Sequence, residues 1–141
     1  MNNEEMKIDA NPNSEEIELI RKRLDEFNEQ IAGNDNHKPI NLIIKNSVNE
    51  IIAGLIGGTY WGWLYIDRVW IKKENRNMGL GSKLLKAAEA EAKGRGCGFA
   101  HLDTMSFQAK GFYEKNGYSV KYEIKDIPKG FSKYLMIKEL K

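Results

Sequence analysis

The stretch that decides the fold runs from Val69 to Leu85 and reads Val-Trp-Ile-Lys-Lys-Glu-Asn-Arg-Asn-Met-Gly-Leu-Gly-Ser-Lys-Leu-Leu. An apolar β-type run leads into a polar segment with two glycines, Gly79 and Gly81, and then into a helical pattern. Glycine lets the backbone approach a ligand closely, and the first-turn N–H groups of a helix have no partner within it. Together with the helix dipole and the charge of Arg76, these groups predict a site for an anion such as pyrophosphate.

A glycine turn of this kind also has a simpler reading, in which glycine only permits tight packing between a strand and a helix. Two other nucleotide motifs fit less well. The chain has no Gly-x-Gly-x-x-Gly followed by an acidic residue at dinucleotide-fold spacing, and Gly81-Ser82-Lys83 does not have the order of a P-loop. An anion cradle and an ordinary strand-to-helix turn are therefore the two alternatives for this segment.

Composition limits the class of protein. The chain has 141 residues, of which 41% are hydrophobic and 30% charged, so we expect a single domain over residues 1–141. A net charge of +2 gives no sign of nucleic-acid binding. The single cysteine, Cys97, excludes an internal disulfide and fits a reducing compartment. Without a bilayer-length apolar run or a secretory signal, we expect a cytoplasmic protein with no membrane partner.

Hydrophobic spacing predicts the order of the elements. Apolar residues recur at steps of three and four from Ile17 to Ile31, and Asn13 with Glu16 forms a helix-capping pair, so a helix is expected up to Gly33. At most a short strand precedes it at residues 6–8. The later elements are expected to be strands at 40–45, 51–60 and 63–71, a helix at 79–93, a strand at 99–103, a helix at 107–115, and a hairpin of strands at 119–127 and 132–137.

This order predicts an α/β (α+β) fold with a mixed, mostly antiparallel sheet and helices on both faces. The first three strands read as an antiparallel meander. Gly57 and Gly58 lie inside the second strand and indicate a bulge or a close backbone approach there.

Two blocks of sequence resemble the GNAT superfamily of acetyl-CoA-dependent N-acetyltransferases. The first, Arg76-Asn77-Met78-Gly79-Leu80-Gly81, is similar to the family signature Arg/Gln-x-x-Gly-x-Gly/Ala between a strand and a helix. The second, residues 107–118, is similar to the late helix of the family, with Phe112-Tyr113 followed by Glu-Lys-x-Gly and an aromatic residue. Many members begin that helix with Asn, where this chain has Gln108. The resemblance covers about residues 40 to 140.

The resemblance implies an acyltransferase that moves an acetyl group from acetyl-CoA to a primary amine by direct attack, with no covalent enzyme intermediate. It implies that main-chain groups of the third strand bind pantetheine like an added strand, and that the Val69 N–H polarises the thioester carbonyl. Ordinary sheet pairing is the alternative for these groups. The implied cofactor-binding residues are Val69, Trp70, Ile71, Arg76, Asn77, Met78, Gly79, Leu80, Gly81, Ser82, Gln108 and Tyr113.

Acyl transfer to an amine needs a donor for the carbonyl oxygen, a proton for the departing thiolate and a route for the proton of the amine. In the resembling family a tyrosine at the place of Tyr113 protonates the thiolate. The alternative for Tyr113 is simple packing of its ring beside Phe112. Asp67 is the candidate general base, because a carboxylate in an apolar strand is costly without a partner. Strict strand alternation places Asp67 on the face of Val69 and Ile71, and a salt bridge to Arg68 is the alternative role.

Other polar and aromatic residues carry weaker signals. His37 and His101 lack the spacing of metal ligands, so we expect no metal site. Cys97 reads as a small buried residue. The cluster Tyr60, Trp61, Trp63 and Tyr65 could line an acceptor pocket or simply pack. Lys83 and Lys86 could meet a cofactor phosphate, or they could form a solvated helix face.

Three functions are compatible with these patterns. An N-acetyltransferase accounts for both sequence blocks and for Tyr113. An acyl-CoA-binding sensor or regulatory module without transferase activity is the alternative, although a pure binder does not need a proton donor. A nucleotide-binding structural domain does not account for the second block. The acceptor is a small-molecule amine or a protein amine, and the sequence leaves a homodimer open.

Overall fold

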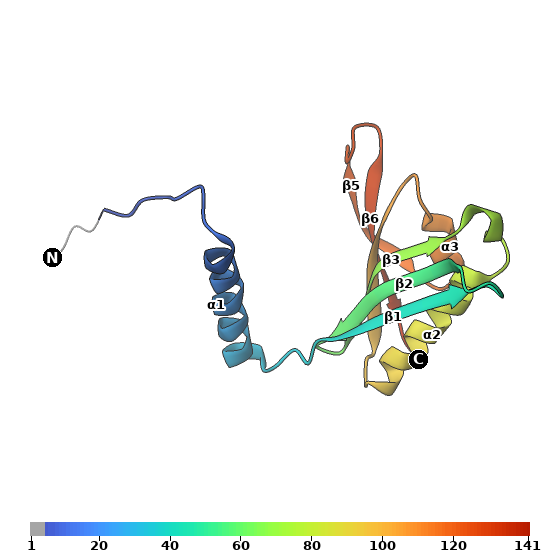
Figure 1. Ribbon diagram of the computed structural model, residues 1–141, viewed down its shortest axis with the longest axis horizontal. Coiled ribbons are helices and arrows are strands. Elements are labelled where there is room, and N and C mark those ends of the chain that lie inside the picture. Colours follow the sequence, from blue (N-terminus) through green and yellow to red (C-terminus); the bar gives the residue numbers. More distant parts are fainter. Residues whose placement is uncertain (1–4) are drawn as a thin grey trace. The chain divides into compact units, whose positions relative to one another are not determined.

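The computed structural model describes residues 5–141 and is shown in Figure 1. The chain divides at residue 35 into an N-terminal unit and a larger unit, residues 36–141. Within the part of the chain that is described, no helix is both long enough and apolar enough to cross a membrane.

The N-terminal unit holds one helix, α1 (Ser14–Ala32). Its start is the predicted capping box: the Asn13 side chain accepts from the Glu16 N–H (2.8 Å) and the Glu16 carboxylate accepts from the Asn13 N–H (3.0 Å). Gly33 ends the helix with φ of 80°, a conformation that glycine adopts without steric cost. No strand forms at residues 6–8, where the sequence suggested at most a short one.

The larger unit is built on a six-stranded sheet in the order β1-β2-β3-β4-β6-β5. All neighbouring strands are antiparallel except β3 and β4, which are parallel. This confirms the predicted fold class of a mixed, mostly antiparallel sheet with helices. The strands are β1 (Lys38–Lys45), β2 (Ile51–Tyr60), β3 (Trp63–Ile71), β4 (Phe99–Met105), β5 (Ser119–Lys125) and β6 (Ser132–Glu139).

Two helices complete the larger unit: α2 (Leu80–Gly94) follows β3, and α3 (Lys110–Lys115) follows β4. A short 3₁₀ helix, η1 (Lys73–Asn75), lies between β3 and α2. Helix α2 packs on one face of the sheet, and its buried apolar residues join Leu55, Leu64 and Leu102 of the strands in one core. Helix α3 starts three residues later than expected, and its Tyr113 belongs to the same core.

Two irregularities in β3 shape the sheet. The pairing of β2 with β3 shifts by one residue, because Ile56 pairs with Arg68 and Gly57 pairs with Ile66, which leaves Asp67 in a bulge. Gly57 is required there because a Cβ would collide with the Tyr65 carbonyl oxygen. The pairing of β3 with β4 runs only from Trp63 to Ile66. The second half of β3 is therefore separated from β4.

Candidate active site

A cavity of about 820 Å³ lies beside the half of β3 that does not pair with β4. Its walls come from the end of β3, the loop before α2, the first turn of α2, and the segment that leads into and through α3. The lining residues are Val69, Trp70, Ile71, Asn75, Arg76, Asn77, Gly79, Leu80, Gly81, Ser82, Phe107, Gln108, Ala109, Gly111, Phe112 and Tyr113. The structure thus brings together the two sequence blocks that are about thirty residues apart in the chain.

The backbone of β3 presents hydrogen-bonding groups to this cavity. The Lys72 N–H donates to the Ile52 carbonyl of β2 at 2.8 Å. Backbone groups of a strand point alternately to its two sides, so the N–H of Trp70 also points toward β2, whereas those of Val69 and Ile71 point away from it. Because β4 does not pair with this half of β3, the Val69 N–H is available to a ligand in the cavity. Ordinary sheet pairing, the alternative for this group, does not occur on that side.

The first turn of α2 forms another wall. Gly79 caps the helix in the left-handed region, with φ of 78°, and makes no side-chain cap hydrogen bond. Neither an acidic side chain nor a capping side chain satisfies the first N–H groups, so they remain donors for an anion. Arg76 is held beside this turn because its Nε donates to the Ile71 carbonyl at 3.1 Å. That bond leaves the Nη groups of Arg76 able to contact a phosphate.

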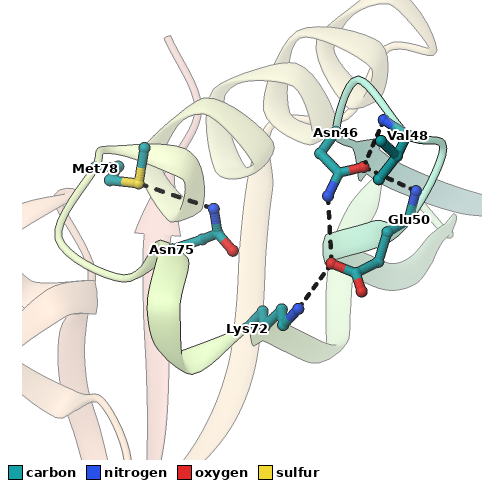
Figure 2. Close-up of polar contacts among 6 residues, drawn as sticks. All are labelled: Asn46, Val48, Glu50, Lys72, Asn75 and Met78. Atoms are coloured by element: carbon teal, nitrogen blue, oxygen red, sulfur yellow. Dashed lines mark hydrogen bonds and ion pairs between the residues drawn. The ribbon is translucent and has the colours of Figure 1, made fainter.

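Polar contacts from the turn between β1 and β2 hold the start of the loop between β3 and α2 (Figure 2). Lys72 Nζ lies 2.7 Å from Glu50 Oε1, and the Asn46 amide donates to the same oxygen at 3.2 Å. The Asn46 carbonyl oxygen in turn accepts the N–H groups of Val48 and Glu50. The hydrogen bond to Glu50 raises the pKa of Lys72. The turn between β1 and β2 therefore anchors the start of the loop that carries Arg76.

Gly81 permits close packing, and its partner is the helix α3 rather than a strand. A Cβ at Gly81 would lie 2.8 Å from Cζ of Phe112, so glycine is needed for α2 to pack against α3. At Gly79 a Cβ would meet nothing within 4 Å, and it is the positive φ that favours glycine. The packing alternative therefore applies at Gly81, while Gly79 shapes the start of the helix.

Tyr113 lines the cavity and is only 7% exposed. Its ring makes edge contacts with Phe112 and Tyr118, at centroid distances of 5.1 and 5.9 Å. Burial raises the pKa of the Tyr113 phenol, so the group keeps its proton at neutral pH. The Tyr113 hydroxyl has no hydrogen-bond partner among the described residues. Every fully buried polar side-chain atom among those residues does have a partner, so the Tyr113 hydroxyl is not fully buried. The hydroxyl is therefore accessible from the cavity.

Asp67 does not lie where strict alternation placed it. The bulge shifts the phase of β3, so Val69 and Ile71 pack against the core while Asp67 and Arg68 are both exposed. The Asp67 side chain is 58% exposed, lies 3.9 Å from Arg68 Nε, and is absent from the cavity lining. The expectation of a buried carboxylate was therefore wrong, because a bulge cannot be seen in the alternation of one strand.

Most of the expected cofactor-binding residues line the cavity, but Met78 does not; it is 63% exposed. Gln108 lines the cavity, although its Oε1 accepts the Met105 N–H at 2.8 Å and so supports the turn before α3. Five lining residues were missed as individual sites: Asn75, Phe107, Ala109, Gly111 and Phe112. Four of these lie inside the second sequence block, residues 107–118, so the resemblance of that block to the family could have identified them.

The remaining candidates lie elsewhere in the larger unit. Tyr60 Oη and His101 Nε2 are 2.9 Å apart, and His37 Nε2 lies 2.7 Å from Tyr65 Oη. Burial lowers the pKa of His101, although Asp103 partly opposes this. Cys97 is buried, and burial raises the pKa of its thiol. This confirms Cys97 as a small buried residue.

Comparison with known proteins agrees with this geometry. The chain matches the Acetyltransferase (GNAT) family over residues 4–118. It is 41% identical over 92 residues to blasticidin-S acetyltransferase of Streptomyces morookaense, covering 64% of this chain and 68% of that protein. It is 36% identical over 106 residues to acetyltransferase Atu2258 of Agrobacterium fabrum, and the match covers 75% of this chain and 77% of that protein.

A solved structure extends the likeness to nearly the whole chain. The crystal structure of an acetyltransferase from Bacillus cereus superposes on this chain with a TM-score of 0.89 and 34% sequence identity. The match covers 95% of this chain and 98% of the Bacillus chain. The match in sequence covers both blocks that line the cavity, and the match in structure covers the fold around it. The chain belongs to the GNAT family of acetyltransferases and is an acetyl-CoA-dependent N-acetyltransferase.

Proposed function

We propose that the cavity between β3, α2 and α3 binds acetyl-CoA with its pyrophosphate at the first turn of α2 and its pantetheine arm along Val69 to Ile71. One observation carries this proposal: the unpaired edge of β3 and the uncapped start of α2 face the same cavity as Tyr113. A pantetheine arm has amide groups that can pair with a strand edge. A pyrophosphate suits the N–H groups of α2 and the charge of Arg76.

The roles of the site residues in transfer follow from this placement. The Val69 N–H donates to the thioester carbonyl oxygen and stabilises the negative charge that develops on it. The incoming amine nitrogen forms a bond to the carbonyl carbon, and the bond from that carbon to sulfur breaks. Tyr113 gives its proton to the departing thiolate, and its raised pKa keeps that proton in place until then.

For the proton of the amine we propose Asp67, acting directly or through water. The bulge exposes its carboxylate two residues before Val69, on the part of β3 that β4 does not cover. An exposed carboxylate can accept a proton from an acceptor that approaches from solvent. The alternative role of Asp67 is an ion pair with the neighbouring guanidinium of Arg68. If Asp67 serves only in that ion pair, acetyl transfer does not require it.

We propose a small-molecule amine as the acceptor. The relative with 41% identity is named as a blasticidin-S acetyltransferase, so blasticidin S is the first compound to test, followed by other amine antibiotics and by peptides with free amines. A cytoplasmic location remains a proposal that rests on the composition of the sequence.

The test measures binding and transfer separately. Calorimetry with acetyl-CoA is expected to give one site per chain, and thiol release in the presence of each amine identifies the acceptor. Asp67→Asn is expected to lower kcat/KM for the amine, while Arg68→Gln, the matched control, keeps the wild-type value. Absence of binding at millimolar acetyl-CoA would overturn the cavity assignment, and a wild-type kcat/KM in a folded Asp67→Asn variant would remove Asp67 from the reaction.

A further inference from the structure

Two phenylalanines meet where the wall of the cavity joins the hairpin of β5 and β6, and the proposed reaction uses neither of them. Phe107 lines the cavity shortly before α3 begins, and Phe131 lies in the loop between β5 and β6. Their rings make an edge-to-face contact, with 5.1 Å between the ring centroids and 83° between the ring planes. Phe107 is 55% exposed and Phe131 46% exposed, so the contact covers only part of each ring.

Hydrogen bonds hold the loop of this hairpin against the segment that carries Phe107. The Ser106 N–H donates to the Ser132 carbonyl at 2.7 Å, and the Ser132 N–H donates to the Ser106 hydroxyl oxygen at 2.9 Å. Within the loop, the Phe131 N–H donates to the Pro128 carbonyl at 2.9 Å. All of these residues belong to the larger unit. Phe131 therefore has a fixed place beside Phe107.

A pair of phenylalanine rings selects a ligand by shape and by ring contact, because it has no hydrogen-bonding group. Aromatic rings attract other rings in offset-stacked or edge-to-face arrangements. Aromatic side chains that line a cavity beside a few polar groups are typical of sites for small molecules. The pair Phe107 and Phe131 therefore suits a flat ring better than an aliphatic chain.

The proposed placement of acetyl-CoA leaves this pair to the acceptor. Its pyrophosphate and pantetheine arm are held by the start of α2 and by Val69 to Ile71 of β3. Phe107 follows β4, and Phe131 precedes β6. The strand order β3-β4-β6-β5 puts both residues on the opposite side of the cavity from the edge of β3. The adenine ring of acetyl-CoA is the competing partner for the pair, and that ring lies beyond the pyrophosphate, away from the thioester.

We propose that Phe107 and Phe131 bind the acceptor, and that the acceptor is an amine that carries an aromatic or other planar ring. This inference rests on the proposed function, because it requires acetyl-CoA on the β3 and α2 side of the cavity. The ring of the acceptor contacts Phe107 from the cavity, while Phe131 supports the Phe107 ring. The amine of the same molecule then reaches the thioester beside the Val69 N–H and Tyr113.

An acceptor screen tests the class of amine. Primary amines are offered in matched pairs, such as phenethylamine and cyclohexylethylamine, which share a carbon skeleton and differ in whether the ring is planar. Rates of thiol release from acetyl-CoA are compared at equal concentrations of the neutral amine, because only the neutral form attacks. The planar member of each pair is expected to have a kcat/KM about tenfold higher, which corresponds to one aromatic contact.

Variants that remove one ring test the two residues. Phe107→Leu and Phe131→Leu keep an apolar side chain, and each is expected to raise the KM for the planar amine about tenfold with unchanged acetyl-CoA affinity in calorimetry. Phe107→Tyr keeps the ring and should retain the wild-type KM. Phe99→Leu is the matched control and should also retain it. Phe99 is 41% exposed and stacks on Trp63 at 4.9 Å, but it does not line the cavity.

Two results would overturn this inference while the proposed function stands. The first is transfer to amines without a planar ring in preference to their planar counterparts. The second is a wild-type KM for the planar amine in Phe107→Leu or Phe131→Leu, or a loss of acetyl-CoA affinity in its place, as stacking of adenine on the pair would produce. Absence of acetyl-CoA binding, or of transfer to every amine in the screen, would overturn the proposed function and this inference together.

Discussion

Tyr113 shows how a single residue obtains its chemistry from its surroundings. Burial between Phe112 and Tyr118 raises the pKa of its phenol, while its hydroxyl remains accessible to the cavity. Tyr113→Phe keeps the ring contacts and removes only the proton, so we expect kcat to fall about 100-fold with little change in acetyl-CoA affinity. Steady-state kinetics with calorimetry measures both. Full activity in Tyr113→Phe would assign the ring to packing alone.

Gly81 makes a second residue-scale prediction. Because its Cβ would lie 2.8 Å from Phe112, Gly81→Ala is expected to push α3 away from α2 and lower the unfolding free energy by about 1–3 kcal/mol, as overpacking does. Acetyl-CoA affinity should fall with it, since Phe112 lines the cavity. The variant Phe112→Leu in the Gly81→Ala background should restore part of the stability. Denaturant unfolding measures the effect, and an unchanged midpoint in Gly81→Ala would contradict the contact.

At the scale of elements, a buried polar cluster joins α2, the end of α3 and β6. Glu89 Oε2 accepts from the Tyr118 hydroxyl at 2.9 Å, and Glu89 Oε1 lies 2.8 Å from Lys138 Nζ. The Tyr118 N–H also donates to the Tyr113 carbonyl at 3.0 Å. The cluster therefore fixes the position of the helix that carries the proposed proton donor.

Tyr118→Phe tests this cluster. It removes a hydrogen bond to a carboxylate, so we expect the unfolding free energy at neutral pH to fall by about 1.5–3 kcal/mol. Burial, with the charge of Glu89 second, raises the pKa of Tyr118 far above its ordinary value near 10. The unfolded chain then releases this proton above about pH 10 while the folded chain retains it, so the contribution of Tyr118 is complete below that pH and declines above it. Unfolding curves should show wild type and Tyr118→Phe converging at alkaline pH, and a constant difference would contradict the assignment.

At the scale of the whole molecule, an acidic N-terminal unit and a basic larger unit are joined in one chain. The net charge of +2 is therefore the sum of two opposite charges, −6 over residues 1–35 and +8 over residues 36–141.

The sequence by itself determined the features that depend on neighbouring residues. The capping box and the span of α1 and the glycine at the start of α2 were predictable, because caps and helical periodicity act within one or two turns. The resemblance of residues 76–81 and 107–118 to one family placed the two blocks at a common site, and both line the cavity. The predicted strand at 99–103 differed from β4 only in its length.

Only the tertiary structure decided what depends on two segments far apart in the chain. The exposure of Asp67 follows from a bulge in the pairing of β2 with β3, and the need for glycine at Gly81 follows from Phe112 on another helix. Alternation within one strand cannot show an extra residue opposite its partner. The available Val69 N–H likewise exists because β4 stops pairing after Leu102. Hydrogen-bond register and side-chain packing are properties of pairs of segments, and no single stretch of sequence contains them.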